Sequence, residues 1–374
     1  MRQLPACLVL AAAASIPRAA AAEIGSIGDA TFEFGGLVQY DAYRYRNDLA
    51  DLDGSLTGDD REHDFRRIEL VLKGALPGGL DWVVAYDAKS EVFLDANLRL
   101  RFGADRQHAL QLGQFKQPNS LDELTSARSN DFIAKATASN TYGISRRLGL
   151  GYVQSRDDWS LAASAFGRKL GSGQDRGSGF GLRGTWVPIR TDGSLLHLGL
   201  SHVDHDTDAD TLRLRARPNA DLASVRLVDS GQLVDTDRIA TTGVEALWLA
   251  GPLKLQGELF HAQVRRHANS DYDSGGAYAS ALWNLGGTAW TYRNGLPALP
   301  SADTRLWQLG LRYDLIDLDD EDVQGGRQEA VTAGVNWYAG KHLKLMLNHV
   351  RVSSRRHGID DDPSIWEARA QLSW

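Results

Sequence analysis

Basic residues gather in one long polar stretch of the sequence, between an alternating segment that ends at Phe115 and another that begins near Arg147. Lysine and arginine hold oxyanions, and the planar fork of arginine makes paired bonds to phosphate or carboxylate. A connection of this length is more often functional than idle, so we predict a site for small anions. The alternative is a solvated surface loop, because acids share the stretch. The basic residues are Lys116, Arg128, Lys135, Arg146 and Arg147, and the acids are Asp122, Glu123 and Asp131.

Segments of alternating apolar and polar residues flank this stretch on both sides. In residues 253–259, for example, leucines alternate with Lys254, Gln256 and Glu258. Strands with one face in hydrocarbon and one in water give this pattern, and so do the strands of a soluble sandwich. The segments run to about ten residues or more, close to the ~9 to 11 that cross a bilayer. Aromatic residues also recur at their ends, as membrane interfaces require: Tyr152, Trp159, Trp186, Trp248, Trp307, Trp337, Tyr338 and Trp374.

We therefore predict an all-β fold, a transmembrane antiparallel β-barrel of about sixteen strands, with an inward-folded third loop, 117–145, that narrows a pore. Short and long connections alternate along the chain, as periplasmic turns and outer loops do. The connection 286–302 breaks this alternation, so either that turn is decorated or the strand count is wrong by a hairpin. The predicted strands are 29–46, 64–76, 79–90, 92–103, 107–116, 146–155, 158–168, 178–189, 193–206, 239–250, 252–266, 275–285, 302–316, 327–339, 341–354 and 363–374.

The first 22 residues have the pattern of a signal peptide, which leaves one barrel domain over residues 23–374. Arg2 supplies the positive start, an apolar run follows, and small residues end at Ala22. The only cysteine, Cys7, lies within this signal, so disulfides and a thiol nucleophile are excluded from the mature chain. The net charge of −7 becomes −9 when Arg2 and Arg18 are removed, and it arises from acid-rich segments that read as solvated loops.

Parity along the strands places a set of basic side chains on the polar, inner face of the barrel. Acids share this face, among them Glu69, Glu258, Asp314 and Glu367, so any one cation is as readily explained by an ion pair inside the lumen. Selectivity depends on the local field at a constriction and not on net charge. The inward cations are Arg67, Lys73, Arg99, Arg101, Arg147, Arg183, Lys254, Arg312, Lys344 and Arg369.

Several motifs resemble those of the phosphate-selective porins O and P. The resemblance covers most of the mature chain, and its most specific part is the run of GG, GVNWY and LMLNHV within residues 312–352. Membership implies a sixteen-stranded outer-membrane barrel, commonly trimeric, with an inward third loop and a ladder of arginines that leads to a basic constriction. The other matching motifs are DFRRIELVLKG at 64–74, LGQFKQPNSLDELTSARSNDFIAKA at 112–136 and SRRLGLGY at 145–152.

The same resemblance implies roles for particular residues. Lys116, at the end of GQFK, and Arg128, in LTSAR, are the constriction candidates. Arg66 and Arg67 match the paired arginines of the FRR motif, although the parity of Arg66 faces lipid or the rim. The predicted anion-binding residues are Lys116, Arg128, Lys135 and Arg147, and the predicted ladder is Arg66, Arg67, Arg99, Arg101, Arg183 and Arg312.

The predicted function is passive permeation of small anions, most of all phosphate, pyrophosphate or polyphosphate, across a bacterial outer membrane. A general or sugar-type diffusion porin, with its arginines mostly paired, is the alternative. The expected partners are inorganic phosphate or related anions, outer-membrane lipid or lipopolysaccharide, and two further copies of the chain, with no nucleic acid. No metal or other cofactor is expected. An enzyme is not predicted, because no serine stands in a recognisable nucleophile setting beside the histidines.

Overall fold

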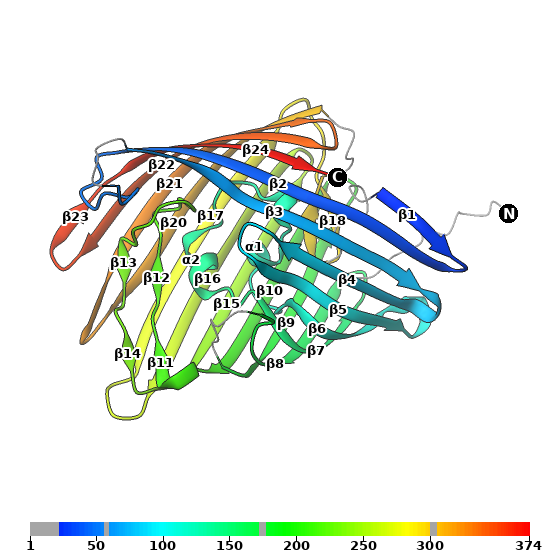
Figure 1. Ribbon diagram of the computed structural model, residues 1–374, viewed down its shortest axis with the longest axis horizontal. Helices are drawn as coiled ribbons and strands as arrows, with labels where there is room; N and C mark the ends of the chain where they lie inside the picture. The colour runs from blue at the N-terminus through cyan, green and yellow to red at the C-terminus, as the bar shows by residue number, and fades with distance from the viewer. Residues whose placement is uncertain (1–21, 56–59, 172–176, 300–304) are drawn as a thin grey trace.

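Alternating segments form the wall of a closed antiparallel barrel in the computed structural model, which describes residues 22–55, 60–171, 177–299 and 305–374 (Figure 1). The main sheet has 18 strands, of which β1 and β23 are short additions, so sixteen form the wall of the described chain. β24 pairs with both β22 and β2, which closes the barrel and confirms the predicted fold class. The wall strands are β2 (Ala30–Arg46), β3 (Arg61–Leu76), β4 (Leu80–Asp87), β5 (Val92–Phe102), β6 (His108–Lys116), β7 (Arg146–Ser155), β8 (Trp159–Phe166), β9 (Gly179–Arg190), β10 (Ser194–Asp206), β15 (Thr236–Ala250), β16 (Leu253–Arg266), β17 (Tyr272–Asn284), β20 (Arg305–Asp320), β21 (Val323–Ala339), β22 (Leu343–Arg356) and β24 (Ser364–Ser373).

Short elements lie in the connections. Two α-helices, α1 (Leu121–Leu124) and α2 (Thr137–Tyr142), belong to the connection between β6 and β7. None of the helices in the described part of the chain is long and apolar enough to span a membrane. The remaining elements are the strands β1 (Ala22–Ile27), β11 (Thr211–Leu212), β12 (Arg215–Ala216), β13 (Val228–Asp229), β14 (Leu233–Val234), β18 (Thr291–Arg293), β19 (Leu296–Ala298) and β23 (Ile359–Asp361), and the 3-10 turns η1 (Pro77–Gly79), η2 (Ala104–Arg106), η3 (Ala127–Ser129) and η4 (Asp208–Asp210).

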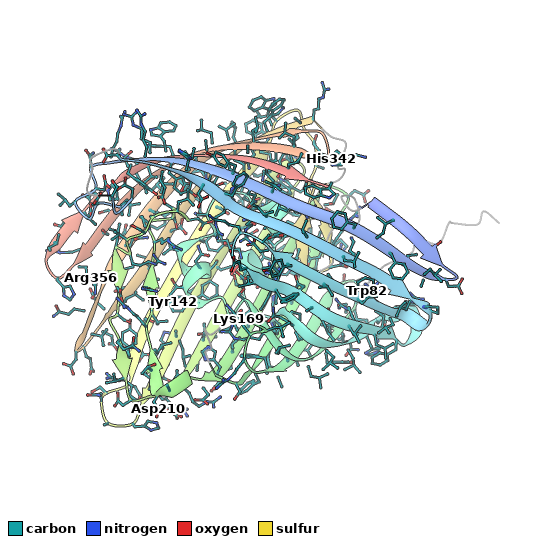
Figure 2. All side chains as sticks on the ribbon, viewed as in Figure 1. Trp82, Tyr142, Lys169, Asp210, His342 and Arg356 are labelled. Atoms are coloured by element: carbon teal, nitrogen blue, oxygen red, sulfur yellow. The ribbon has the colours of Figure 1, made fainter. Side chains whose placement is uncertain are left out.

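The long connections 117–145 and 207–235 lie at one end of the barrel, called the long-loop end, together with some short turns such as 321–322; the opposite end is called the short-turn end. His342 marks the short-turn end, and Arg356 and Asp210 mark the long-loop end (Figure 2). The irregular connection between β17 and β20 is a decorated turn, because it carries the β18–β19 hairpin. Trp290, next to this hairpin, donates a hydrogen bond from its Nε1 to the carbonyl of Pro252 at 3.0 Å. The strand count predicted from the sequence is therefore right.

Apolar side chains cover the outer face of the barrel between two belts of aromatic residues. Leucines such as Leu112, Leu200 and Leu311 are more than half exposed there, as expected for a surface that faces lipid. Tyr338 was predicted to join a belt but lies on the inner face, where the ammonium of Lys344 is 4.8 Å from its ring. The belt near the short turns contains Trp82, Phe102, Trp159, Trp186, Trp248, Trp283, Trp307 and Trp337, and the belt near the long loops contains Tyr40, Phe65, Phe93, Phe180, Tyr313 and Trp366.

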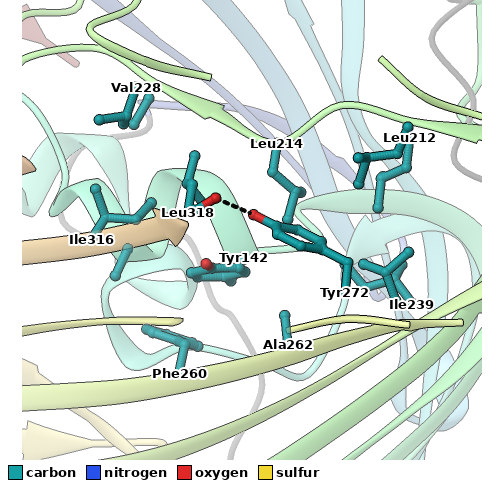
Figure 3. Close-up of a cluster of buried hydrophobic side chains, with 14 residues drawn as sticks. Tyr142, Leu212, Leu214, Val228, Ile239, Phe260, Ala262, Tyr272, Ile316 and Leu318 are labelled. Carbon is teal, nitrogen blue, oxygen red and sulfur yellow. Dashed lines mark hydrogen bonds between the residues drawn. The ribbon is translucent and has the colours of Figure 1, made fainter. Parts of the chain in front are cut away.

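The inner face changes character halfway along the barrel. Near the short turns it is mostly polar, as the alternation predicts, except where Val187, Leu195, Leu247 and Leu249 pack with the β18–β19 hairpin. Near the long loops it is apolar and forms a buried core with the loop 207–235. In Figure 3, Leu212 and Leu214 of this loop lie beside Tyr272, whose hydroxyl donates to the carbonyl of Leu318 at 3.0 Å. The expectation of a polar inner face throughout is therefore wrong for the long-loop half, because a second loop packs against the wall there.

Candidate functional site

The loop 117–145, called the basic segment below, is closed at its base by one asparagine. The side-chain nitrogen of Asn119 donates to the carbonyl of Tyr142 at 3.0 Å, and its oxygen accepts from the backbone nitrogen of Ile144 at 3.1 Å. Ser120 caps α1 by accepting from the backbone nitrogen of Glu123 at 3.1 Å. These local bonds fold the polar sequence NSLDEL into a compact unit and do not leave it as an extended loop.

The basic segment is bonded to the inner face of the wall over half of the barrel. Six of its backbone carbonyls between Ala127 and Ala134 accept hydrogen bonds from side chains on β2, β20, β21, β22 and β24. The carboxylate of Asp131 also accepts from Lys254 at 2.5 Å. Buried carbonyls need such partners, because each costs free energy when left unpaired. The donors, in order along the segment, are Gln39, Gln371, Lys344, Asn336, Arg369 and Arg312.

Several cations predicted for the lumen are thus committed to contacts within the protein. Arg312 donates to the carbonyl of Ala134 at 2.9 Å and pairs with Asp314 at 2.7 Å. Arg183 pairs with Glu245 at 2.5 Å, and both side chains are buried. These two members of the predicted ladder hold the wall and the basic segment, and their positive charge is balanced by a carboxylate.

The lysines of the basic segment converge on Glu123. The ammonium of Lys135 pairs with its carboxylate, and the ammonium of Lys116 donates to its carbonyl and to the carbonyl of Thr125 at 2.9 Å. Near the end of β6, Gly113 has a φ of 119°, and the consecutive residues Gln114 and Phe115 are both buried. The structure therefore places Lys116 and Lys135 as supports of α1.

Acid should loosen this support at a defined pH. Burial alone would raise the pKa of the Glu123 carboxyl, but Lys135 and Lys116 lower it to about 2. A lowered pKa stabilises the folded segment above the unfolded value of ~4.3, by about 3 kcal/mol, and this is lost as pH falls toward 2. We expect single-channel conductance to be steady from pH 7 to about 4.5 and to become noisy below about pH 3.

The variant Glu123→Gln provides the comparison for this acid transition. It lacks the titrating carboxylate, so its current should already be noisy at pH 7 and should change little on acidification. Recordings from both proteins in planar bilayers between pH 7 and 2.5 check the result. An identical acid response in the variant would show that another group controls it.

The other two predicted constriction residues occupy different settings. Arg128 is partly exposed and donates from Nη1 to the carbonyl of Trp374 at 3.2 Å. Arg147 is buried, and its Nη1 donates to the carbonyl of Arg146 at 3.2 Å. Arg146 itself pairs with Asp95 at 2.8 Å. The four predicted constriction residues are therefore not gathered at a single point: Lys116 and Lys135 meet at Glu123, Arg147 is buried, and Arg128 is partly exposed.

A second group of cations lies on β3 and β5, outside the strands that hold the basic segment by hydrogen bonds. Arg67 pairs with Glu69 at 2.9 Å, Lys73 with Glu33 at 3.1 Å and Arg101 with Asp81 at 2.7 Å. Their side chains are 19%, 12% and 19% exposed, respectively. Arg99, which is directly opposite Asp81 on β4, completes the group. From Arg67 to Lys73 and then to Arg99 and Arg101, these side chains descend the inner face toward the short turns.

Arg66 also points inward, which the sequence parity did not predict. Gln39 of β2 pairs with Arg67, and Tyr40 pairs with Phe65, so Arg66 is the extra residue of a β-bulge. Its guanidinium pairs with Asp221 at 2.9 Å. The bulge lets two consecutive arginines of the FRR motif face the interior, and the expectation that Arg66 faces lipid or the rim is therefore wrong.

Asp221 is a functional candidate that the sequence analysis missed. It comes from the loop 207–235 and lies between Arg66 at 2.9 Å and Arg369 at 3.8 Å. Burial would raise the pKa of this carboxyl, but Arg66 and Arg369 hold it well below its usual range. Two residues earlier, Asn219 joins Thr137 of the basic segment to Asp314 of the wall. The signal for this second loop was the apolar parity of Phe260, Ala262 and Val264 on β16.

Comparisons with known proteins agree with this arrangement. A family model described as "Phosphate-selective porin O and P" matches residues 38–374. An uncharacterized protein of Caulobacter vibrioides is 27% identical over 345 residues, which cover 86% of this chain and 68% of that protein. Porin O of Pseudomonas aeruginosa is 23% identical over 228 residues, about half of either chain (51% and 52%).

The fold has counterparts among solved structures. The anion-selective porin from Comamonas acidovorans superposes with a TM-score of 0.58 at 12% identity, over 92% of this chain and all of that one (100%). Such a likeness concerns the fold alone. The family match, which covers most of the chain, assigns the barrel to the outer membrane and indicates a channel rather than an enzyme. By these matches, the chain belongs to the family of phosphate-selective porins O and P.

Proposed function

We propose that the protein is a passive channel for small anions, with phosphate or pyrophosphate as its preferred class. The observation that carries this proposal is the row of inner-face cations Arg67, Lys73, Arg99 and Arg101, called the β3–β5 ladder below, of which Arg99 is buried and the other three are partly exposed. An anion that passes along this row exchanges part of its hydration for guanidinium and ammonium donors. Loose binding at successive cations permits release as well as entry.

The basic segment is proposed to lie within the barrel and to narrow the pore opposite this ladder. Its support is the set of hydrogen bonds from inner-face side chains, which hold its backbone against β20 to β24. Arg128 is the segment cation that we assign to the pore, whereas Lys116, Lys135 and Arg147 fix the segment. The family resemblance implies a trimer, and we include a homotrimer in the proposal.

A general diffusion porin is the second candidate, because three of the four ladder cations are each paired with an acid. Glu69, Glu33 and Asp81 offset much of the positive field at Arg67, Lys73 and Arg101. Such a balanced lumen would pass small polar solutes with little preference for charge. Selectivity for phosphate then requires that the phosphate, with its higher charge and many acceptor oxygens, competes with these carboxylates for the arginines.

Phosphate block of chloride current separates the two candidates. Purified, refolded protein is recorded in a planar bilayer in potassium chloride, and inorganic phosphate is added in steps at constant ionic strength. The proposal predicts that millimolar phosphate reduces the chloride current in a saturable way. Sulfate, added at the same total charge, is the control for a general effect of multivalent anions on the current. Unchanged current with phosphate, together with block by uncharged sugars, would favour the general porin.

A further inference from the structure

Four exposed arginines lie together on the outer face of the barrel at its long-loop end. Arg44 and Arg46 are on β2, Arg61 is on β3 and Arg351 is on β22. Arg44 is directly opposite Arg61, and Arg46 and Arg351 are both opposite Ser364 on β24. These four residues, called the outer arginine cluster, thus occupy three strands around β24.

The cluster shares its face with the lipid-facing side chains. Tyr40, Phe65 and Trp366, which belong to the aromatic belt, are exposed on the same face, whereas Tyr43 and Tyr45 of the opposite parity are buried. Trp366 is directly opposite Arg44. Arg46 and Arg351 lie two residues farther along their strands, about 7 Å beyond the belt. An aromatic belt marks the membrane interface, so the cluster lies at the level of lipid headgroups.

Within the described residues, no carboxylate is paired with this concentration of charge. Like charges directly opposite one another destabilise an antiparallel pair, and Arg44 and Arg61 form such a pair. Among the described residues, no ion pair joins any of the four arginines to a carboxylate, although Asp362 is exposed near Ser364. Other arginines of the same face and end do have partners. Arg327 pairs with Glu329 at 2.8 Å, and Arg355 pairs with Asp360 at 3.5 Å.

We propose that the outer arginine cluster binds the phosphate groups of an outer-leaflet lipid, a phosphorylated glycolipid of the lipopolysaccharide type. Guanidinium groups bind phosphate through paired hydrogen bonds, and the bound anion offsets the repulsion between Arg44 and Arg61. Below the cluster, the rings of Tyr40, Phe65 and Trp366 offer an apolar surface to the acyl chains. A site that combines positive charge at the headgroup level with an apolar surface on its membrane side fits a lipid better than a free anion.

Binding of a phosphorylated lipid to refolded protein in neutral detergent tests the proposal. Lipid A is titrated against the wild type and against a variant with Arg44→Gln, Arg46→Gln, Arg61→Gln and Arg351→Gln, and the bound fraction is followed by native mass spectrometry. The affinity should fall at least tenfold in the variant. A matched variant, Arg327→Gln with Arg355→Gln, removes two partnered arginines from the same face and should bind as the wild type does.

Three results would overturn the site. These are equal binding of fully dephosphorylated lipid A, equal loss in the matched variant, and saturation by inorganic phosphate at the concentration at which lipid A saturates. The last would identify a free anion as the ligand. A thermal measurement keeps the test valid if the quadruple variant folds poorly. Without lipid, the single variant Arg61→Gln should melt at the same temperature as the wild type or at a higher one, because the repulsion between Arg44 and Arg61 is relieved. Its melting temperature should rise less than that of the wild type when lipid A is added.

Discussion

Replacing the three arginines of the β3–β5 ladder together, by Arg67→Gln, Arg99→Gln and Arg101→Gln, is expected to lower the ratio of chloride to potassium permeability at least tenfold. A unit charge about 6 Å from an ion contributes about 0.7 kcal/mol in a water-filled lumen. Three charges together contribute about 2 kcal/mol, or roughly thirtyfold. The carboxylates of Glu69 and Asp81 would lose their partners and add repulsion. Reversal potentials of wild type and variant under a potassium chloride gradient measure the change.

The partner acids of the same ladder provide the opposite test. The variant Glu33→Gln, Glu69→Gln and Asp81→Asn leaves the cations without their carboxylates, and its preference for anions should rise above that of the wild type. Arg327→Gln with Arg355→Gln, on the outer face, should leave the reversal potential unchanged. If the ladder variant kept the wild-type selectivity while folding normally, permeation would have to follow another part of the wall.

Substituting Asp221→Asn is expected to release the loop 207–235 from the wall and to lower the free energy of unfolding by about 3 kcal/mol. The carboxylate of Asp221, 16% exposed, lies between Arg66 and Arg369, so its removal leaves two guanidinium groups partly unbalanced. The loop should then open more often. Trypsin should cleave it faster at Arg217, and single-channel currents should be larger and noisier. Urea unfolding, limited proteolysis and bilayer recordings test these effects together.

Asp229 of the same loop is the matched control. Asp229 is itself only 5% exposed, but its partner Arg213 is 45% exposed and can be hydrated when the carboxylate is removed, so Asp229→Asn should cost only about 1 kcal/mol. The rate of trypsin cleavage and the single-channel current of the Asp229→Asn variant should resemble those of the wild type. Equal effects of the two substitutions would mean that the loop is held by its apolar contacts and not by Asp221.

The fold could be predicted from the sequence because its strongest signals are periodic. Leucines and aromatic residues in 253–259 and 307–313 recur at alternate positions, and this alternation indicates both the strand and the face that meets lipid. The decorated turn at 286–302 was open to two interpretations, because Trp290 and the β18–β19 hairpin depend on packing against distant strands. Closure of β24 on β2 followed from strand number and the terminal aromatic strand.

The site could be predicted only in part, because the sequence of one strand does not show which distant residue pairs with a charged side chain on that strand. Parity identified Arg67, Arg99, Arg101 and Arg312 as inward, but not that Arg312 would bond the carbonyl of Ala134. Arg66 was misplaced, because a β-bulge has no clear sequence signal here. Asp221 was missed, since its ion pairs join residues more than a hundred positions apart.

The reversal potential of the wild-type channel under a tenfold potassium chloride gradient tests the central claim most directly. For a channel that passes only anions, the reversal potential equals the equilibrium potential of chloride, which is about 59 mV in magnitude at 25 °C for a tenfold gradient. If the β3–β5 ladder makes the channel anion-selective, the reversal potential should have the sign of the chloride equilibrium potential and more than half its magnitude. A potential near zero, or one with the sign of the potassium gradient, would contradict it and leave a general porin in its place.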